Sequence, residues 1–388
     1  MNIPAANRLN QVEEYYFSTK LREIRRRVQE GQDIINLGIG SPDLSPAEDV
    51  LNTLVESALQ PANHAYQPYK GIPELRESFA NWYGKSFGVH LAPDSELLPL
   101  MGSKEGIMHI SFAFLNPGDS VLVPDPGYPT YTSVARLLGA KIRHYPLCEE
   151  NGWLPNLAQL ETEGLAGVKM MWVNYPHMPT GTAASPELFD ELIAFAQRHK
   201  ILLVNDNPYS LVLNPSPMSI LARYGAKGVA LELNSLSKSH NMAGWRVGMV
   251  AGHSEYIDKV LRVKSNMDSG MFLPVQLAAS KALLLEDSWH QARNDIYQAR
   301  RKVARQILKN LGCTYQEDQV GMFLWARIPE NTPSSAEFSD QILDSLSIFL
   351  TPGFIFGQQG EGYIRLSLCS KLERLREARD RIGKSLFA

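Results

Sequence analysis

The chain of 388 residues has little cysteine and no long apolar run. Its three cysteines, Cys148, Cys313 and Cys369, lie far apart and form no C-x-x-C pair. This spacing argues against a disulfide framework or a metal site, and it suits a reducing compartment, so we expect a cytoplasmic protein without a metal. No stretch approaches the roughly 18 consecutive apolar residues of a membrane span. The first residues, MNIPAANRLNQVEEYYF, lack the basic start and apolar core of a secretory signal, so we expect no membrane association.

A strong excess of charge of either sign is also missing. The chain has 38 Lys and Arg against 41 Asp and Glu, for a formal net charge of −3. Nothing in this balance favours a nucleic acid or an anionic membrane as a partner. The one basic cluster, KLREIRRRVQEG, has apolar residues at helical spacing and is typical of a solvated amphipathic helix. With 44% hydrophobic residues, the chain is long enough for a large core and two domains.

The fingerprints of common nucleotide sites are absent as well. There is no G-x-x-x-x-G-K-[ST] motif, and GIGSPD carries Asp43 where a dinucleotide fold needs its third glycine. The segment SLSK matches the S-x-x-K motif of penicillin-recognising acyl enzymes, but no K-T-G follows it. We regard that match as the weakest of the alternatives.

What the sequence does contain is an alternation of apolar runs and helical patterns through its middle third. The runs SVLVPDPGYP, VKMMWVNYP, ILLVNDNPY and VALELNSLSK each lead into a polar or Gly/Pro turn. Between them, SPELFDELIAFAQRHK predicts a helix with Ser185 as its cap and Pro186 at its first position. This alternation predicts an α/β fold with a mostly parallel sheet covered by helices on both faces.

From about Ser280 onward the pattern changes to a long helix followed by short strands and a last amphipathic helix. This change predicts a smaller α+β domain that the N-terminal segment joins. We therefore expect a large domain over residues 45–280 and a small domain formed by residues 1–44 and 281–388.

Reactive side chains collect where the predicted strands end, which is the edge at which such sheets bind ligands. Lys238 ends one predicted strand, where desolvation would lower its pKa and make the amine nucleophilic. Asp206 ends a neighbouring strand, and Tyr209 follows it by three residues. Tyr128 lies beyond a third strand and offers a flat apolar face.

The segment LLPLMGSKEGIMHISFAFL predicts a strand, a glycine turn and a helix whose N-terminus would suit a phosphate. The residues that open this helix are Gly102, Ser103 and Lys104. Further hydroxyl and guanidinium donors follow another strand of the same sheet, namely Ser235, Ser237 and Arg246. Each residue alone has an ordinary structural explanation. Together, a nucleophilic lysine, an acid, a phenol, an aromatic plate and a phosphate cup fit pyridoxal 5'-phosphate.

From INLGIGSPDLS to YIRLSLC, the sequence resembles the class I/II aminotransferases of fold type I, which depend on pyridoxal phosphate. The segments YQPYKGIPELR, GSKEGI, VPDPGYP, LSKSHNMAGWR and KSNMDSG are most similar to the branch of LL-diaminopimelate and alanine aminotransferases. The resemblance implies a seven-stranded, mostly parallel sheet in the large domain and a homodimer with shared active sites. It also implies ping-pong transfer of an amino group between an L-amino acid and a 2-oxo acid, expected to be 2-oxoglutarate.

The resemblance further implies roles for single residues. Lys238 would form the Schiff base and move the α-proton, Asp206 would pair with the ring nitrogen, and Tyr209 would donate to the phenolic oxygen. Tyr128 would stack on the ring. The phosphate would be held by Gly102, Ser103, Lys104, Ser235, Ser237 and Arg246, and Tyr66 would reach the phosphate of the neighbouring subunit.

On the substrate side, the resemblance implies that Arg365 clamps the α-carboxylate and that the backbone of Gly40 lies against the same group. Candidates for the distal pocket are Tyr15, Ile39, Tyr69 and Asn266, of which the last two would come from the neighbouring subunit. The segment RVKSNMDSGMF lacks the second arginine of aspartate aminotransferases, which argues against that specialisation. A donor of the diaminopimelate, alanine, methionine or aspartate type stays open.

The chain departs from the family pattern at one position. The motif N-P-T-G reads M-P-T-G here, so Met178 replaces an asparagine that hydrogen-bonds the cofactor's phenolic oxygen. A thioether accepts weakly and cannot donate. Either Tyr209 alone carries that oxygen, or the activity of this chain has shifted. Two further alternatives stay open: a pyridoxal-phosphate lyase of the same fold, and a cofactor-binding protein with reduced transaminase activity.

Overall fold

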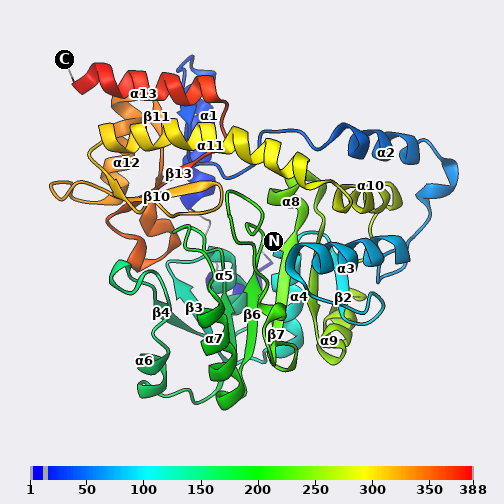
Figure 1. The fold of residues 1–388 in the computed structure, drawn as a ribbon. Coiled ribbons are helices and arrows are strands. Elements are labelled where there is room, and N and C mark those ends of the chain that lie inside the picture. The colour runs from blue at the N-terminus through cyan, green and yellow to red at the C-terminus, as the bar shows by residue number, and fades with distance from the viewer. Residues whose placement is uncertain (1–2, 12–15, 387–388) are drawn as a thin grey trace.

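The computed structural model describes residues 3–11 and 16–386, and its main feature is a large sheet (Figure 1). Over the described residues this sheet has seven strands in the order β2-β8-β7-β6-β5-β3-β4. The strands are β2 Leu97–Leu100, β8 Gly248–Gly252, β7 Ala230–Ser235, β6 Leu202–Asp206, β5 Val168–Val173, β3 Ser120–Asp125 and β4 Lys141–Pro146. β8 runs antiparallel to β2 and β7, while β7, β6, β5, β3 and β4 are parallel. The predicted seven-stranded, mostly parallel sheet is confirmed.

Helices cover both faces of this sheet, which explains why its central strands are continuous apolar runs. One face packs on α4 Ser103–Phe114, α5 Pro129–Leu137 and α9 Ser254–Lys264. The other packs on α3 Pro73–Phe87, α7 Pro186–His199 and α10 Leu273–Leu283, with α6 Leu157–Thr162 at its border. α2 Glu48–Ala58 lies on α10. The predicted start of α7 is confirmed, since the Ser185 side chain accepts a hydrogen bond from the Leu188 N–H.

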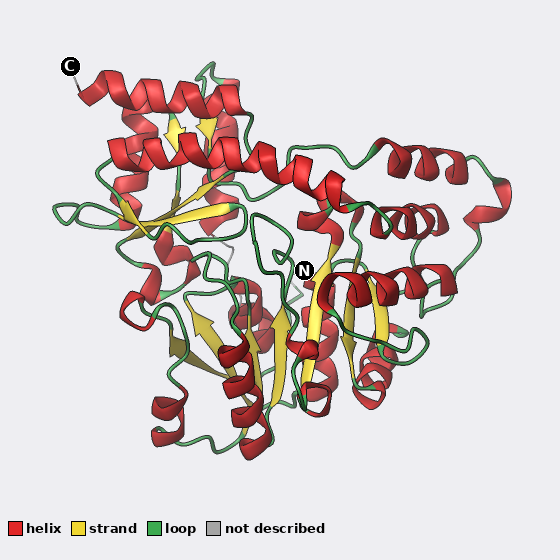
Figure 2. Cartoon of the chain, viewed as in Figure 1, coloured by secondary structure: helices red, strands yellow, loops and turns green. Residues whose placement is uncertain are grey.

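A second group of elements lies above the large sheet and contains two small sheets (Figure 2). An antiparallel sheet has the order β12 Thr351–Pro352, β13 Tyr363–Ser367, β10 Phe323–Arg327 and β9 Thr314–Tyr315. A parallel pair joins β1 Ile35–Asn36 to β11 Ile348–Phe349, so the N-terminal segment enters this part of the fold. The helices here are α1 Tyr16–Gln29, α11 Asp287–Asn310, α12 Ser335–Leu346 and α13 Leu372–Leu386, of which α11 and α13 lie side by side (Figure 1).

Short helical segments fill the connections. One is α8 Leu236–Ser239, directly after β7. The others are 3₁₀ turns at Asn7–Gln11, Pro61–His64, Glu149–Asn151, Ile220–Ala222, Ala226–Gly228, Ala243–Trp245, Gly353–Phe356 and Gln358–Gly360. Within the described ranges, no helix is both long and apolar enough to cross a membrane.

Asp43, the residue that breaks the dinucleotide motif, ties the N-terminal segment to α11. The guanidinium of Arg300 donates to both carboxylate oxygens of Asp43, at 2.6 and 2.8 Å, and to the Leu368 carbonyl at 3.0 Å. Arg300 is buried, and such a bidentate pair is geometrically restrictive. This contact holds the chain after β1 against the small sheets, which fixes the position of Gly40.

Glu232 organises the interior beneath the carboxyl end of β7. Its side chain is fully buried and accepts from Tyr83 Oη at 2.9 Å and Asn205 Nδ2 at 2.9 Å. It also accepts from Ser219 Oγ at 2.7 Å and from the Ile220 N–H at 3.0 Å. Burial raises the pKa of this carboxyl, and the four hydrogen bonds oppose that rise. The network joins α3, β6, β7 and the turn at 219–222.

We expect Glu232→Leu to lower the free energy of unfolding by roughly 3–5 kcal/mol, because four buried donors lose their acceptor. Equilibrium urea unfolding measures this loss. Lys169→Leu, at an exposed position of β5, is the control and should change stability by less than about 0.5 kcal/mol. A loss below about 1 kcal/mol for Glu232→Leu would contradict the role given to this network.

Candidate active site

A pocket of about 500 Å³ lies beyond the carboxyl ends of the parallel strands. Asn174 follows β5, Asp206 ends β6 and Ser235 ends β7, so parallel register brings all three to one edge. The pocket gathers most of the predicted site residues: Gly40, Ser103, Lys104, Tyr128, Asp206, Tyr209, Ser235, Ser237, Lys238, Arg246 and Arg365.

Lys238 lies in α8, one helical turn beyond β7, rather than at the end of the strand as the sequence pattern indicated. Its Nζ donates to the Gly40 carbonyl at 2.5 Å. The pocket removes the amine from bulk water, and this desolvation lowers the pKa of Lys238 to about 8, assisted by the charges of Arg365 and Arg246. Roughly a tenth of the side chain is therefore an uncharged amine at pH 7, far more than for a solvated lysine, and nucleophilic chemistry requires that form.

Asp206 is the buried acid of the pocket. Its Oδ2 accepts from Tyr131 Oη at 2.9 Å, while no group in the described ranges hydrogen-bonds its Oδ1. Burial raises the pKa of Asp206 to about 7, and the Tyr131 hydrogen bond opposes that rise. Asn174 Nδ2 donates to the Asp206 backbone carbonyl at 2.5 Å and so holds the strand end in place. The free oxygen suits a cationic N–H donor on a ligand.

Arg246 lines the pocket and lies against Gly102, a predicted site residue that does not itself line it. Gly102 precedes α4 with φ +83°, and a Cβ there would lie 2.2 Å from Arg246 Nη2. Only glycine therefore lets the guanidinium approach the start of the helix. Ser103 Oγ is buried, and nothing in the described chain hydrogen-bonds it. Backbone N–H groups, a hydroxyl and a guanidinium converge here, which is a suitable set for a phosphate.

Arg365, on β13, forms the opposite wall. Its Nη2 donates to the Gly38 carbonyl at 3.0 Å, and its guanidinium carbon lies 4.0 Å from the centre of the Phe323 ring. Burial lowers the pKa of Arg365 to about 10, so the group stays charged at neutral pH. No ion pair joins it to a carboxylate of the described residues. A Cβ on Gly40 would lie 2.3 Å from the Phe323 ring, so this approach also requires glycine.

Met178 contacts Arg365 directly. The thioether sulfur lies 3.2 Å from Arg365 Nη1, and the Met178 N–H donates to Asn174 Oδ1 at 2.9 Å. The side chain is buried in the pocket wall. The substitution therefore places a weak acceptor beside the guanidinium where an amide would have both an acceptor and a donor.

Several predicted residues do not reach this pocket. Tyr66 is 91% exposed and Tyr69 is 46% exposed, and Asn266 is also exposed. All three lie outside the pocket of their own chain, and so does Ile39. Tyr15 lies outside the described residues.

Other residues of the site were missed at the sequence level. Tyr131 follows Tyr128 by three residues on α5, so helical spacing could have indicated its inward position. Asn174 directly follows β5, and from the sequence we expect reactive side chains at such strand ends. Phe323 comes from the small sheet, and no local signal connects it with Arg365. Other lining residues include the aromatic and apolar side chains of Tyr16, Phe17, Ile355 and Phe356.

Comparisons with known proteins agree with this geometry. The sequence profile of the family described as Aminotransferase class I and II matches residues 32–382. An LL-diaminopimelate aminotransferase from Halothermothrix orenii is 39% identical over 382 residues, which is 98% of each chain. One from Dehalococcoides mccartyi is 41% identical, covering 95% of this chain and 96% of its own. The solved structure of substrate-bound BacF from Bacillus subtilis has a TM-score of 0.95 and 35% identity, covering 99% of this chain and 98% of that chain. This chain therefore belongs to the class I and II aminotransferases, which are pyridoxal-phosphate-dependent transferases.

Proposed function

We propose that this chain binds pyridoxal phosphate in the pocket described above and transfers an amino group between an L-amino acid and a 2-oxo acid. One observation carries the proposal. The shielded amine of Lys238 stands in a single pocket with an unsatisfied acid, an anion cup and a carboxylate-binding arginine.

The residues present fit the cofactor. Ser103 Oγ and the guanidinium held against Gly102 suit its phosphate, and Asp206 Oδ1 suits a protonated ring nitrogen. Tyr128 offers a flat face, and Tyr209 offers a phenol whose pKa burial raises above its usual range, so it stays a donor. Bound pyridoxal phosphate supplies an aldehyde that condenses with amines and a ring that accepts an electron pair.

The chain's own residues then supply binding and proton transfer. Arg365 holds the substrate α-carboxylate through its planar fork and so fixes the α-carbon in the pocket. Lys238 Nζ, as a free amine, accepts the proton that leaves the α-carbon and later gives it up again. Asp206, with one oxygen held by Tyr131, keeps its other oxygen for the ring nitrogen. The aromatic walls restrict access of water.

For the donor, we propose LL-diaminopimelate first, because the relatives with that name are 38–41% identical over nearly the whole chain. The structure favours a second candidate, an amino acid with an apolar or aromatic side chain. Apolar and aromatic side chains line the pocket that Arg365 also lines, namely Tyr16, Phe17, Ile355 and Phe356. Among the described residues, the only other arginine that lines this pocket is Arg246 of the phosphate cup. For the acceptor we propose 2-oxoglutarate, in a ping-pong sequence.

We further propose a homodimer with shared active sites. Exposed aromatic and thioether side chains gather on the segments 61–70 and 264–273, which meet where Lys264 Nζ donates to the Tyr69 carbonyl at 2.9 Å. The exposed side chains are Tyr66, Tyr69, Met267 and Phe272. Apolar side chains grouped on a surface favour a protein partner. We also propose that residues 45–280 form the large domain and that residues 1–44 and 281–388 form the small domain.

The transamination proposal is tested by adding single amino acids to the cofactor-loaded protein without any 2-oxo acid. We expect LL-diaminopimelate to bleach the visible band of the cofactor and 2-oxoglutarate to restore it. If L-phenylalanine or L-methionine bleaches the band instead, the donor is an amino acid with an apolar or aromatic side chain. Release of pyruvate from an amino acid with no need for a 2-oxo acid would contradict transamination and indicate a lyase. Lys238→Ala is the control and should convert none of them.

The pKa of Lys238 makes capture of the cofactor depend on pH. Folding lowers this pKa from 10.5 to about 8, so the reactive neutral amine prevails above about pH 8. We expect the rate at which cofactor-free protein captures pyridoxal phosphate to rise with pH to a plateau, with a midpoint near 8. Stopped-flow absorbance measures that rate, and a lysine-containing peptide serves as the reference. A midpoint close to 10.5 would mean that the pocket does not shield the amine.

Met178→Asn tests what the thioether has changed. An amide beside the cofactor's phenolic oxygen donates a hydrogen bond to an oxyanion, worth roughly 1.5–3 kcal/mol. We therefore expect the pH midpoint of the bound cofactor's visible spectrum to fall by at least about one unit. Met178→Leu, which removes sulfur but adds no donor, is the matched control and should leave the midpoint in place. An unchanged midpoint for Met178→Asn would show that Tyr209 does not carry that oxygen alone.

A further inference from the structure

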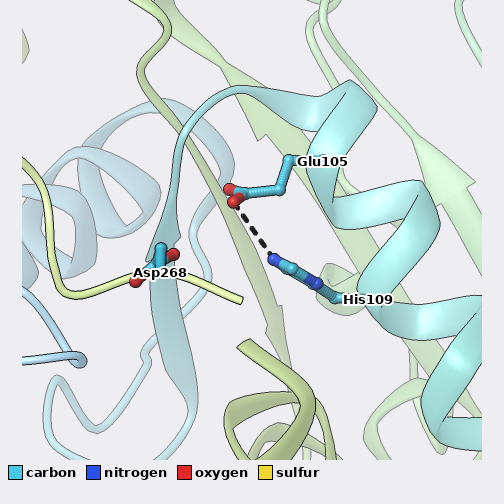
Figure 3. A group of neighbouring side chains, drawn as sticks. All are labelled: Glu105, His109 and Asp268. Atoms are coloured by element: carbon cyan, nitrogen blue, oxygen red, sulfur yellow. Dashed lines mark ion pairs between the residues drawn. The ribbon is translucent and has the colours of Figure 1, made fainter. Parts of the chain in front are cut away.

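Three side chains outside the active-site pocket converge on one point (Figure 3). Glu105 and His109 lie four residues apart on α4 and so share a face of the helix. Asp268 comes from the loop between α9 and α10. One ligand atom from each lies within 4.8 Å of the other two. From the sequence we expect no metal, but that expectation rests on the spacing of the cysteines, which does not bear on a site of nitrogen and oxygen ligands.

His109 is a buried imidazole with a carboxylate beside it but with no hydrogen-bonded partner among the described residues. Its side chain is 2% exposed, and neither ring nitrogen makes a hydrogen bond within the described ranges. Nε2 lies 3.2 Å from Glu105 Oε1, and Figure 3 shows the ring edge directed at that carboxylate. Four ligands at about 2.0 Å from a tetrahedral ion lie about 3.3 Å apart. The 3.2 Å between these two atoms therefore matches the spacing of two ligands of one ion, although a His–Glu ion pair has the same spacing.

The two carboxylates are each held by one oxygen and keep the other available. Glu105 Oε2 accepts from the Met101 N–H at 2.6 Å, which leaves Oε1 facing His109. Asp268 Oδ1 accepts from Lys264 Nζ at 2.8 Å and from the Gly270 N–H at 3.0 Å. Asp268 Oδ2 is buried, and no described group hydrogen-bonds it. Hydrogen bonds of this kind, made to the second oxygen of a carboxylate, are those that orient metal ligands.

The charges around the cluster also favour a cation. Glu105 and Asp268 carry two negative charges, and the buried ammonium of Lys264 balances one of them, since it pairs with Asp268. One negative charge is left beside the imidazole in a mostly buried site. Imidazole with carboxylates suits a divalent transition metal ion better than the all-oxygen ligands that Mg²⁺ and Ca²⁺ prefer.

We propose that Glu105 Oε1, His109 Nε2 and Asp268 Oδ2 bind a divalent transition metal ion, with Zn²⁺ as the ion to test, and that water completes the coordination. The ion would join the first turn of α4, which carries Ser103, to the loop after α9. Asp268 in this loop accepts from Lys264, whose Nζ also donates to the Tyr69 carbonyl. The site is structural, because it connects the helix of the phosphate cup with the proposed subunit surface and does not line the active-site pocket.

The test uses cofactor-loaded, tag-free protein without added amino acids, because amino acids and pyridoxal phosphate together chelate metals. After treatment with a chelator and dialysis, Zn²⁺ is titrated and the bound metal is measured by mass spectrometry of the dialysed protein. We expect about one Zn²⁺ per chain. His109→Gln and Asp268→Asn should each raise the Kd at least about tenfold, since removing a ligand costs no less than disturbing an outer contact.

His199→Gln is the matched control, because His199 Nε2 lies 2.7 Å from Glu161 Oε1 on the surface and no third ligand joins them within the described residues. This variant should bind Zn²⁺ like the original chain. If a variant of the cluster loses its fold, as shown by the cofactor band and circular dichroism, Glu105→Gln replaces it. No stoichiometric binding, or equal binding by all variants, would overturn the proposal and leave a protonated His109 between two carboxylates. Neither outcome depends on transaminase activity.

Discussion

The parallel register of β5, β6 and β7 is the constraint on which the site depends. It places the ends of three buried strands at one edge of the sheet. Asn174, Asp206 and Ser235 therefore lie at the same edge, although they are far apart in the sequence. The Glu232 network lies beneath that edge and joins β6, β7 and α3. Because β7 leads directly into α8, the position of Lys238 follows from the same strand.

Desolvation gives this edge its chemistry. It lowers the pKa of Lys238 to about 8, raises that of Asp206 to about 7 and lowers that of Arg365 to about 10. Each shift disfavours a charge that the pocket does not neutralise. A ligand that brings a phosphate, a carboxylate and a protonated ring nitrogen supplies the missing partners. The same groups that cost stability in the free chain thus become binding groups for that ligand.

Much of the fold could be predicted from local patterns, because buried parallel strands leave long apolar runs and capped helices leave recognisable starts. Asp206, Tyr209 and Lys238 could be predicted for that reason, because each lies at the end of a strand or within three residues after it. The contact of Phe323 with Arg365 was not, since it depends on how the small sheet packs on the large one. The Glu105, His109 and Asp268 cluster was hidden for a similar reason, because Asp268 is distant in sequence.

Met178 shows where a motif alone falls short. The sequence indicates that an asparagine is missing, but only the structure shows the sulfur against the guanidinium of Arg365. The substitution therefore concerns the substrate arginine as well as the cofactor's oxygen. A chain can keep the family fold while one buried contact changes the electrostatics of its site.

The central claim is that Lys238 is the amine that holds the cofactor, and borohydride reduction tests it most directly. The protein is loaded with pyridoxal phosphate, reduced and digested, and the modified peptide is identified by mass spectrometry. The account predicts one stable adduct per chain, on Lys238. A stoichiometric adduct on another lysine, such as Lys104, with Lys238 unmodified would contradict it.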